Sequence, residues 1–146
     1  MTLDPLSEQR RIRHLRAGWS LLLLWLTLGM ALEFMHGFKV RWYLDVTNET
    51  RRLMWTLAHA HGTLLALVHI AFAASLSAVA GEEPAWRRRA SRLISWGALL
   101  LPLGFLLGGI LVHGSDPWIG ILLVPVGALC LLAGVALTAR GVSART

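Results

Sequence analysis

The chain has 146 residues, of which 55% are hydrophobic and 15% are charged. This composition excludes a soluble domain with a polar shell and indicates a membrane protein, organised as a single domain over residues 1–146. The formal net charge of +6 would also suit a nucleic-acid-binding protein. However, the basic residues flank long apolar runs, which points to the lipid bilayer as the partner and not to nucleic acid.

Four apolar stretches are each long enough to cross a hydrocarbon core of about 30 Å, which needs about 20 helical residues. They cover approximately residues 17–36, 53–80, 93–112 and 118–138. The first stretch is too long for a cleavable signal peptide and is not followed by a small-residue cleavage site, so it should remain as a span. The predicted fold class is therefore all-α, a four-transmembrane-helix bundle with up-down-up-down topology.

The basic residues are divided unevenly between the two ends of these spans. Ten lie in the N-terminal segment, the loop after the second span and the C-terminal tail, and four lie in the loop after the first span. Because arginine and lysine are retained on the cytoplasmic side, we expect both termini to be cytoplasmic. The expected location is the cell inner (plasma) membrane, as a multi-pass protein.

The second span is unusual because it carries three histidines, although a polar side chain inside a membrane costs roughly 2–4 kcal/mol. A helical period of 3.6 residues places one stripe of small residues and imidazoles on one face: His59, Gly62, Ala66, His69 and Ala73. A bulkier stripe lies nearly opposite: His61, Leu65, Val68 and Phe72. The small stripe favours His59 as the interior residue, but spacing alone leaves open which of His59 and His61 faces the bundle.

Potential ligands from three spans lie at one membrane level, in the outer third. Glu33 and His36 end the first span on one helix face, His59 and His61 lie about two turns into the second, and His113 ends the third. We therefore predict an outer-leaflet site with the cofactor-binding residues His36, His59, His61 and His113. The predicted metal ligands are Glu33, His36, His59 and His113.

Imidazoles bind haem iron, copper or zinc, and a neighbouring carboxylate either ligates the metal or orients a histidine. Haem in a helical bundle takes axial histidines from facing helices at similar depth. The expected cofactor is therefore haem b or a copper or zinc ion, and the expected function is electron transfer or cofactor handling. No catalysed reaction follows from these residues, so whether the chain is an enzyme is left open.

The N-terminal segment before the first span is basic and begins with Ser7-Glu8-Gln9-Arg10, which can start a helix that runs directly into that span. Such a leader typically anchors to anionic headgroups. We expect His14, which belongs to this leader, to be solvated.

The last two spans carry regularly spaced glycines, with Gly104 and Gly108 in the third and Gly120, Gly127 and Gly134 in the fourth. Small residues at these intervals favour close contact between helices. A bundle of this size has little interior, so we expect some of these grooves to meet another subunit, in a homo-oligomer or a larger membrane complex. The alternative function is accordingly a non-enzymatic accessory or assembly subunit, packed through its glycine-rich helix faces.

Two resemblances follow from these segments. The order EFMHG (residues 33–37), LAHAHGTLLALV (57–68) and GILLVPVGALCLLAGVAL (120–137) resembles small four-span membrane proteins of bacteria and mitochondria whose function is uncharacterised. That resemblance implies the four-span architecture and no activity. Separately, Glu33-x-x-His36 is similar to the haem-binding four-helix halves of haem A synthase, which implies a haem site. In that family the pair opens a helix and is followed by arginine, whereas here it closes a helix and is followed by Gly37.

Overall fold

The computed structural model describes residues 4–45, 48–78 and 85–143. Within them lie four long helices, α1 (Pro5–Gly37), α2 (Thr50–Ala78), α3 (Ala85–Gly108) and α4 (Leu123–Ser143). A two-stranded hairpin of β1 (Val112–His113) and β2 (Asp116–Pro117) and the 3-10 helix η1 (Ile119–Leu122) join α3 to α4. Four helical segments, the last formed by η1 with α4, are long and apolar enough to cross a membrane. The prediction of an all-helical protein with four long apolar helices is confirmed.

Two helix ends differ from the predicted spans for local reasons. Helix α1 begins at Pro5, well before residue 17, because the Asp4 side chain accepts hydrogen bonds from the backbone N–H groups of Leu6 and Ser7 and caps the helix. Helix α3 ends at Gly108, four residues before the expected end of the third span at residue 112. The chain leaves the helix at this glycine pair and enters the hairpin, where Gly114 adopts a φ of +60°.

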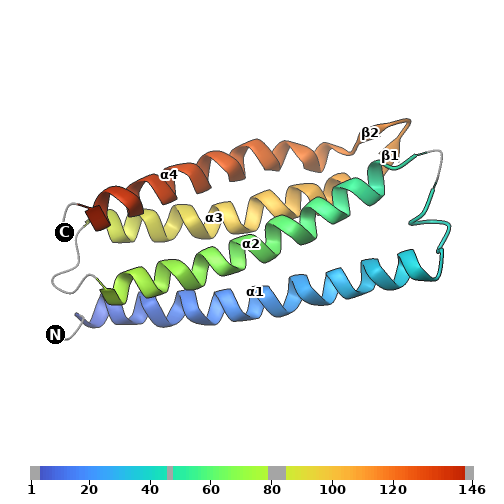
Figure 1. The fold of residues 1–146 in the computed structure, drawn as a ribbon. Coiled ribbons are helices and arrows are strands. Elements are labelled where there is room, and N and C mark those ends of the chain that lie inside the picture. Colours follow the sequence, from blue (N-terminus) through green and yellow to red (C-terminus); the bar gives the residue numbers. More distant parts are fainter. Residues whose placement is uncertain (1–3, 46–47, 79–84, 144–146) are drawn as a thin grey trace.

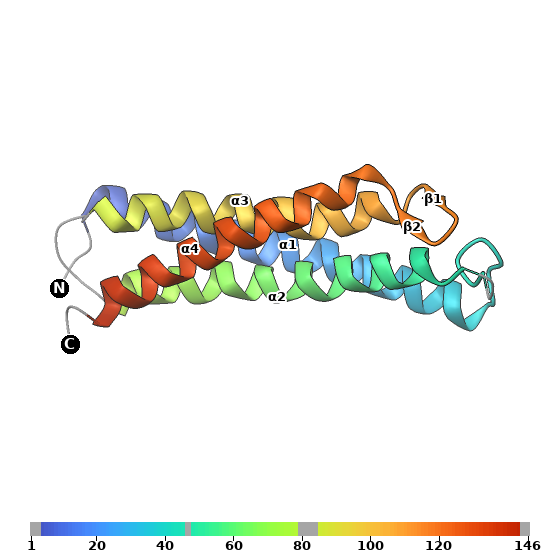
Figure 2. The same ribbon diagram turned by 90° about the horizontal axis from the view of Figure 1, so that it is seen from above.

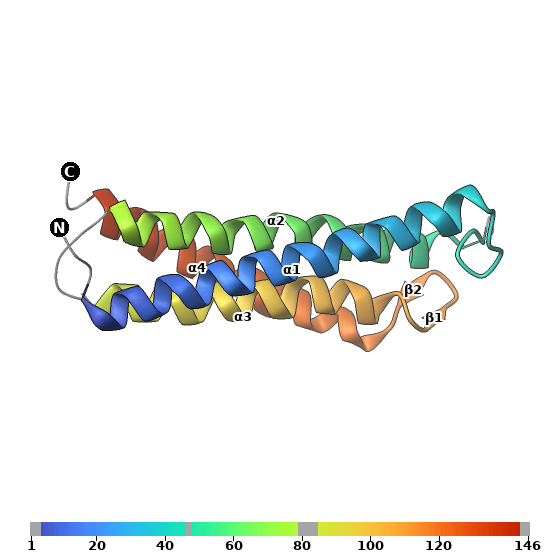
Figure 3. The same ribbon diagram turned by 90° about the horizontal axis from the view of Figure 1, so that it is seen from below.

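Consecutive helices pack side by side in antiparallel pairs. In the α1–α2 pair, His14 meets His69, and further along α1 Trp25 meets His59, which comes earlier in α2. Figure 1 shows α1 and α4 on opposite sides of the central α2–α3 pair, with the start of α1 and the end of α4 at the same end of the bundle. Helix α4 crosses the central pair obliquely (Figure 2), and α1 runs from beside the start of α3 to beside the start of α2 (Figure 3).

The regularly spaced glycines pack α3 against α4 within the chain. A Cβ atom on Gly127 would lie 2.5 Å from the backbone nitrogen of Leu101, and one on Gly104 would lie 2.9 Å from the backbone nitrogen of Val124. Gly134 likewise approaches the backbone of Ile94. These glycines therefore bring the two helix backbones together, and the grooves from which a partner subunit was predicted are filled by the protein itself.

Large apolar side chains cover much of the outer surface. Leu23 and Leu24 on α1 and Leu129 and Leu132 on α4 each have more than half of their surface exposed, at 70%, 57%, 67% and 68%. Apolar surface of this extent is found on proteins that face lipid. The two outer helices therefore present the apolar faces that a bilayer requires.

Candidate functional site

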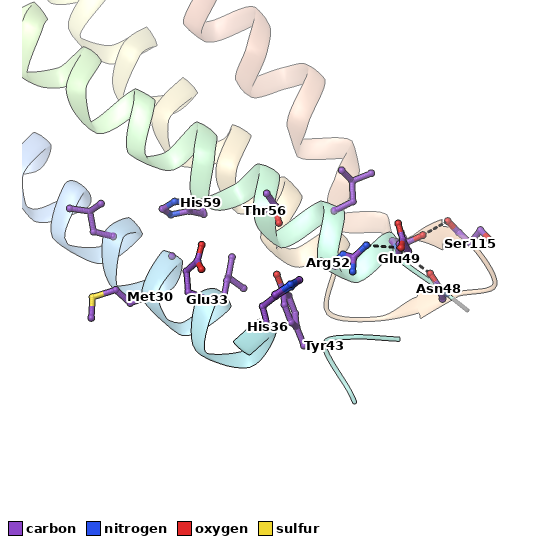
Figure 4. A pocket seen from close by; sticks show the side chains of 15 residues that line it. Met30, Glu33, His36, Tyr43, Asn48, Glu49, Arg52, Thr56, His59 and Ser115 are labelled. Carbon is purple, nitrogen blue, oxygen red and sulfur yellow. Dashed lines mark hydrogen bonds and ion pairs between the residues drawn. The ribbon is translucent and has the colours of Figure 1, made fainter. Parts of the chain in front are cut away.

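A groove of about 1100 Å³ lies between α1 and α2, near the loop that connects them. Three of the predicted ligands line it: Glu33 and His36 from α1 and His59 from α2. Its lining includes the apolar side chains of Leu26, Met30, Leu32 and Leu53, and polar side chains gather towards the start of α2 and the hairpin (Figure 4): Tyr43, Asn48, Glu49, Thr50, Arg52, Thr56 and Ser115. The groove therefore suits an amphipathic ligand, with an apolar body and a polar edge.

His59 is held in one orientation by the backbone of α1. Its Nδ1 atom lies 2.8 Å from the carbonyl oxygen of Trp25. Since a carbonyl can only accept a hydrogen bond, Nδ1 carries the proton in the neutral ring and Nε2 keeps its lone pair. Gly29 makes this approach possible, because a Cβ at that position would overlap the imidazole. The local geometry thus holds the imidazole in one orientation, with its Nδ1 and Nε2 edge packed against Gly29 of α1.

Glu33 and His36 supply the other polar groups of this groove from α1. Both side chains are exposed. Figure 4 shows the Glu33 side chain extending from α1 towards His59. Because Gly29 touches the His59 ring, Glu33 lies about one helical turn and His36 about two turns, roughly 10 Å, beyond the level of that ring. His36 therefore does not oppose His59 across the groove as a second axial ligand would.

The mouth of the groove is built by contacts between the start of α2 and the hairpin. The Asn48 side chain donates to the carbonyl oxygen of Gly114, and the Thr50 hydroxyl donates to that of Ser115 at 2.9 Å. Arg52 forms an ion pair with Glu49 at 2.6 Å. The two hydrogen bonds to the hairpin join residues more than sixty positions apart in the chain, so they hold the start of α2 and the hairpin together at the opening of the groove.

Arg51, whose role the sequence did not reveal, joins three segments behind this mouth. Its guanidinium donates to the carbonyl oxygens of Trp42 at 2.8 Å and Gly109 at 3.1 Å. It also stacks on the Trp42 ring, with 4.6 Å between Cζ and the ring centroid. The carbonyl groups at the end of α3 lack helical partners, so Arg51 caps α3 while holding the α1–α2 loop in place.

The other two predicted histidines lie elsewhere. The Nδ1 atom of His61 is 2.8 Å from the Leu57 carbonyl oxygen of its own helix, and its ring packs on Phe105 of α3, with ring centroids 5.0 Å apart. His113 is exposed in β1 and does not line the groove. Of the five residues that were expected to converge on one site, Glu33, His36 and His59 line the groove, and His61 and His113 do not. Among the residues that the structure describes, no three His, Cys, Asp or Glu side chains are grouped closely enough to hold a metal ion.

Both stripes of α2 lie inside the protein, because α2 is placed between α1 and α3. On the small stripe, His59 and Gly62 face α1, where the Trp25 ring covers Gly62. On the bulkier stripe, His61 and Leu65 face α3. We expected only one of His59 and His61 to face the interior. In the structure both do: His59 faces α1 and His61 faces α3.

A second polar cluster, which the sequence did not predict, lies at the opposite end of the bundle. His14 is buried, with 1% of its surface exposed, so its expected solvation is wrong. Its Nδ1 atom lies 2.7 Å from Nδ1 of His69, and its Nε2 atom lies 2.8 Å from the Ser91 hydroxyl. Arg13 also donates to that hydroxyl at 2.8 Å. This chain of hydrogen bonds, here called the inner network (Arg13, His14, His69 and Ser91), connects α1, α2 and α3.

A sequence signal for the burial of His14 did exist. The buried residues of α1 recur at spacings of three, four and seven along the whole helix: Ser7, His14, Gly18, Trp25, Gly29 and Leu32. Such spacing marks one packed helix face. The stripe therefore runs through the basic leader without a break, and His14 occupies a position on it.

No protein-family model matches the chain, and no curated protein or solved structure is significantly similar to it. The resemblances to small four-span proteins and to haem A synthase therefore stay predictions.

Proposed function

We propose that the chain is a multi-pass protein of the cell inner (plasma) membrane that binds haem b in the α1–α2 groove and handles this cofactor. The observation that carries the proposal is the oriented His59 imidazole, whose Nδ1 atom is bonded to the Trp25 carbonyl oxygen and whose ring lines a groove of mixed apolar and polar side chains. Haem has the matching shape, with an apolar ring and two carboxylates at one edge. When bound, it would supply a one-electron redox centre.

The residues around the groove fit haem better than a bare metal ion. A copper or zinc site needs three or four protein ligands in one cage, and no such group occurs among the described residues. Haem can be held by one axial histidine, as in globins. At the mouth, the guanidinium group of Arg52 and the second amide N–H of Asn48 provide hydrogen-bond donors for its carboxylates.

Handling of the cofactor is favoured over electron transfer by the same geometry. Bundle proteins that carry electrons through haem commonly fix the iron between two axial ligands on facing helices. Here His36 lies about two helical turns from the level of His59, so His59 is the single well-placed imidazole of the groove. A haem held on one side in an open groove can be received and released.

Spectroscopy of the purified protein tests this proposal. Wild type titrated with haemin in detergent should develop the absorption band of a histidine-ligated haem at one equivalent, and His59→Ala should lose it. His61→Ala is the matched control, because it removes an imidazole from the same helix that faces α3 instead of the groove. Equal spectra for wild type and His59→Ala would refute the proposal.

The proposed orientation is up-down-up-down with both termini cytoplasmic, which places the groove on the outer side. It is supported by the ten-to-four distribution of basic residues. A reporter fused after Thr146 should read cytoplasmic, and one fused after Trp42 should read exterior. A cytoplasmic reading at Trp42 would move the groove to the inner side.

The alternative function, an accessory or assembly subunit, was predicted from the glycine-rich faces of α3 and α4. Because these glycines contact each other's helices within the chain, they provide no separate support for a partner subunit. The oligomer prediction remains open to a mass measurement in detergent.

A further inference from the structure

Arg13 lines two surface depressions at the end of the bundle opposite the α1–α2 groove. The first, here called the basic depression, lies along the surface of α1 and is lined by Gln9 and three arginines together with two apolar side chains: Arg10, Arg13, Arg16, Leu6 and Ile12. The second is a groove of about 250 Å³ between α1 and α3, with apolar walls formed chiefly by Ala17, Leu21 and Leu99. Since Arg13 lines both, the basic depression and the apolar groove meet at its side chain.

The inner network holds Arg13 in this position. One guanidinium nitrogen donates to the Ser91 hydroxyl at 2.8 Å. Ser91 is fully buried and is itself bonded to the buried His14, which is bonded to His69. An arginine has five N–H donors, so this single bond leaves donors to bind a ligand. Buried polar groups from three helices thus fix the orientation of a charged side chain at the surface.

The charge at this site is positive. Arg13 and Arg16 are three residues apart and both exposed, so their side chains lie about one helical turn apart on the surface of α1. The nearest acidic residue of the helix, Glu8, is paired with Arg11 at 2.6 Å. Two neighbouring guanidinium groups disfavour a cation and favour a phosphate group.

The apolar groove continues from this charge towards the middle of the membrane. Trp19 on α1 and Trp96 on α3 lie about one and a half turns further along their helices than His14 and Ser91, and they are 62% and 56% exposed. Exposed indoles of this kind settle at the boundary between headgroups and hydrocarbon. The basic depression therefore lies at headgroup level, and the groove lies where acyl chains begin.

We infer that this end of the bundle is a binding site for an anionic phospholipid, with the phosphate at Arg13 and an acyl chain in the α1–α3 groove. The lipid would sit against α1 and α3 at once and tie the N-terminal turns of α1 to the bundle. In this site Arg13 binds the ligand, and His14 and Ser91 are positioning residues. The site is separate from the haem groove, so either proposal can fail without the other.

Native mass spectrometry of the full chain with added phosphatidylglycerol or phosphatidylcholine tests the inference. Wild type should retain phosphatidylglycerol in preference to phosphatidylcholine. Arg13→Gln should weaken this binding about tenfold or more, the effect of losing a hydrogen bond to a charged group. Arg89→Gln is the matched control, because it removes the same charge from an exposed position on α3 and should cost at most about fivefold.

A second variant distinguishes the contribution of the α1–α3 groove to lipid binding from that of the arginine charge. Ala17→Phe leaves every arginine in place but fills the α1–α3 groove, so it should also weaken phosphatidylglycerol binding. Arg16→Gln serves in place of Arg13→Gln should the latter fail to fold, since Arg16 is exposed. The inference would be overturned if Arg89→Gln weakened phosphatidylglycerol binding as much as Arg13→Gln (or Arg16→Gln) does, because the lipid would then respond to surface charge in general. It would also be overturned if wild type retained the two lipids equally. Unchanged binding by Ala17→Phe would overturn the placement of the acyl chain.

Discussion

The contact between α3 and α4 gives the sharpest stability prediction, because two of its glycines differ in the space around them. A Cβ on Gly127 would lie 2.5 Å from the backbone nitrogen and 2.9 Å from the Cα atom of Leu101. These are main-chain atoms of a helix, which cannot rotate away as a side chain would. A Cβ on Gly108, the last residue of α3, would lie 3.6 Å from its nearest neighbours, Ile121 of η1 and Pro117 of β2, which is an ordinary van der Waals distance.

Gly127→Ala must therefore push α4 away from α3 by about 1 Å, and a gap of that size loses a quarter to a half of the dispersion energy of each contact. Overpacking of this kind costs about 1–3 kcal/mol, which corresponds to a fall of roughly 2–10 °C in melting temperature for a chain of this size. Gly108→Ala should change the melting temperature little. Tryptophan fluorescence during heating in detergent measures both.

The difference in melting temperature between Gly127→Ala and Gly108→Ala tests whether the backbones of α3 and α4 are in contact at Gly127. Equal melting temperatures for Gly127→Ala and wild type would mean that α3 and α4 are not in backbone contact at Leu101. A loss of the same size in Gly108→Ala would mean that any added methyl group in this region is destabilising, and the argument from local space would be refuted.

Three further predictions follow from other contacts. Gly29→Ala should weaken haem binding without altering any ligand, because the added methyl group displaces the His59 ring; a haemin titration checks this. His14→Leu should lower the free energy of unfolding by about 1–3 kcal/mol, since it leaves Nδ1 of the buried His69 without its partner; a denaturation series in detergent measures the loss. The third concerns Asp4, whose pKa is lowered from its ordinary value of 3.8, chiefly by a side-chain hydrogen bond with Ser7 and further by the backbone N–H groups that it caps. A lowered pKa in the folded state stabilises the protein above the unfolded pKa and ceases to do so as the pH falls through the folded value. The wild-type melting temperature should therefore fall more steeply below pH 3.8 than that of Asp4→Asn, which keeps a capping oxygen but does not titrate.

The architecture was predictable from the sequence because it depends on local properties. A run of about 20 apolar residues forms a membrane-length helix whatever its neighbours are, so the four long apolar helices could be predicted from the stretches beginning near residues 17, 53, 93 and 118. Spacing within one helix is equally local. The two stripes of α2 were correctly separated, and the glycines of α3 and α4 were correctly expected to allow close contact.

The composition of the site depended instead on how the helices are arranged around one another. Periodicity gives the angle between His59 and His61, but whether each faces lipid or a neighbouring helix depends on α2 lying between α1 and α3. Depth along the membrane suggested that His113 would join the others, yet the end of α3 at Gly108 carries it into an exposed hairpin. His14 is buried because the first turns of α1 lie beside the start of α3, where His14 forms hydrogen bonds with Ser91 of α3 and His69 of α2. In each case the deciding quantity is the position of a second or third helix, and no segment taken alone contains that information.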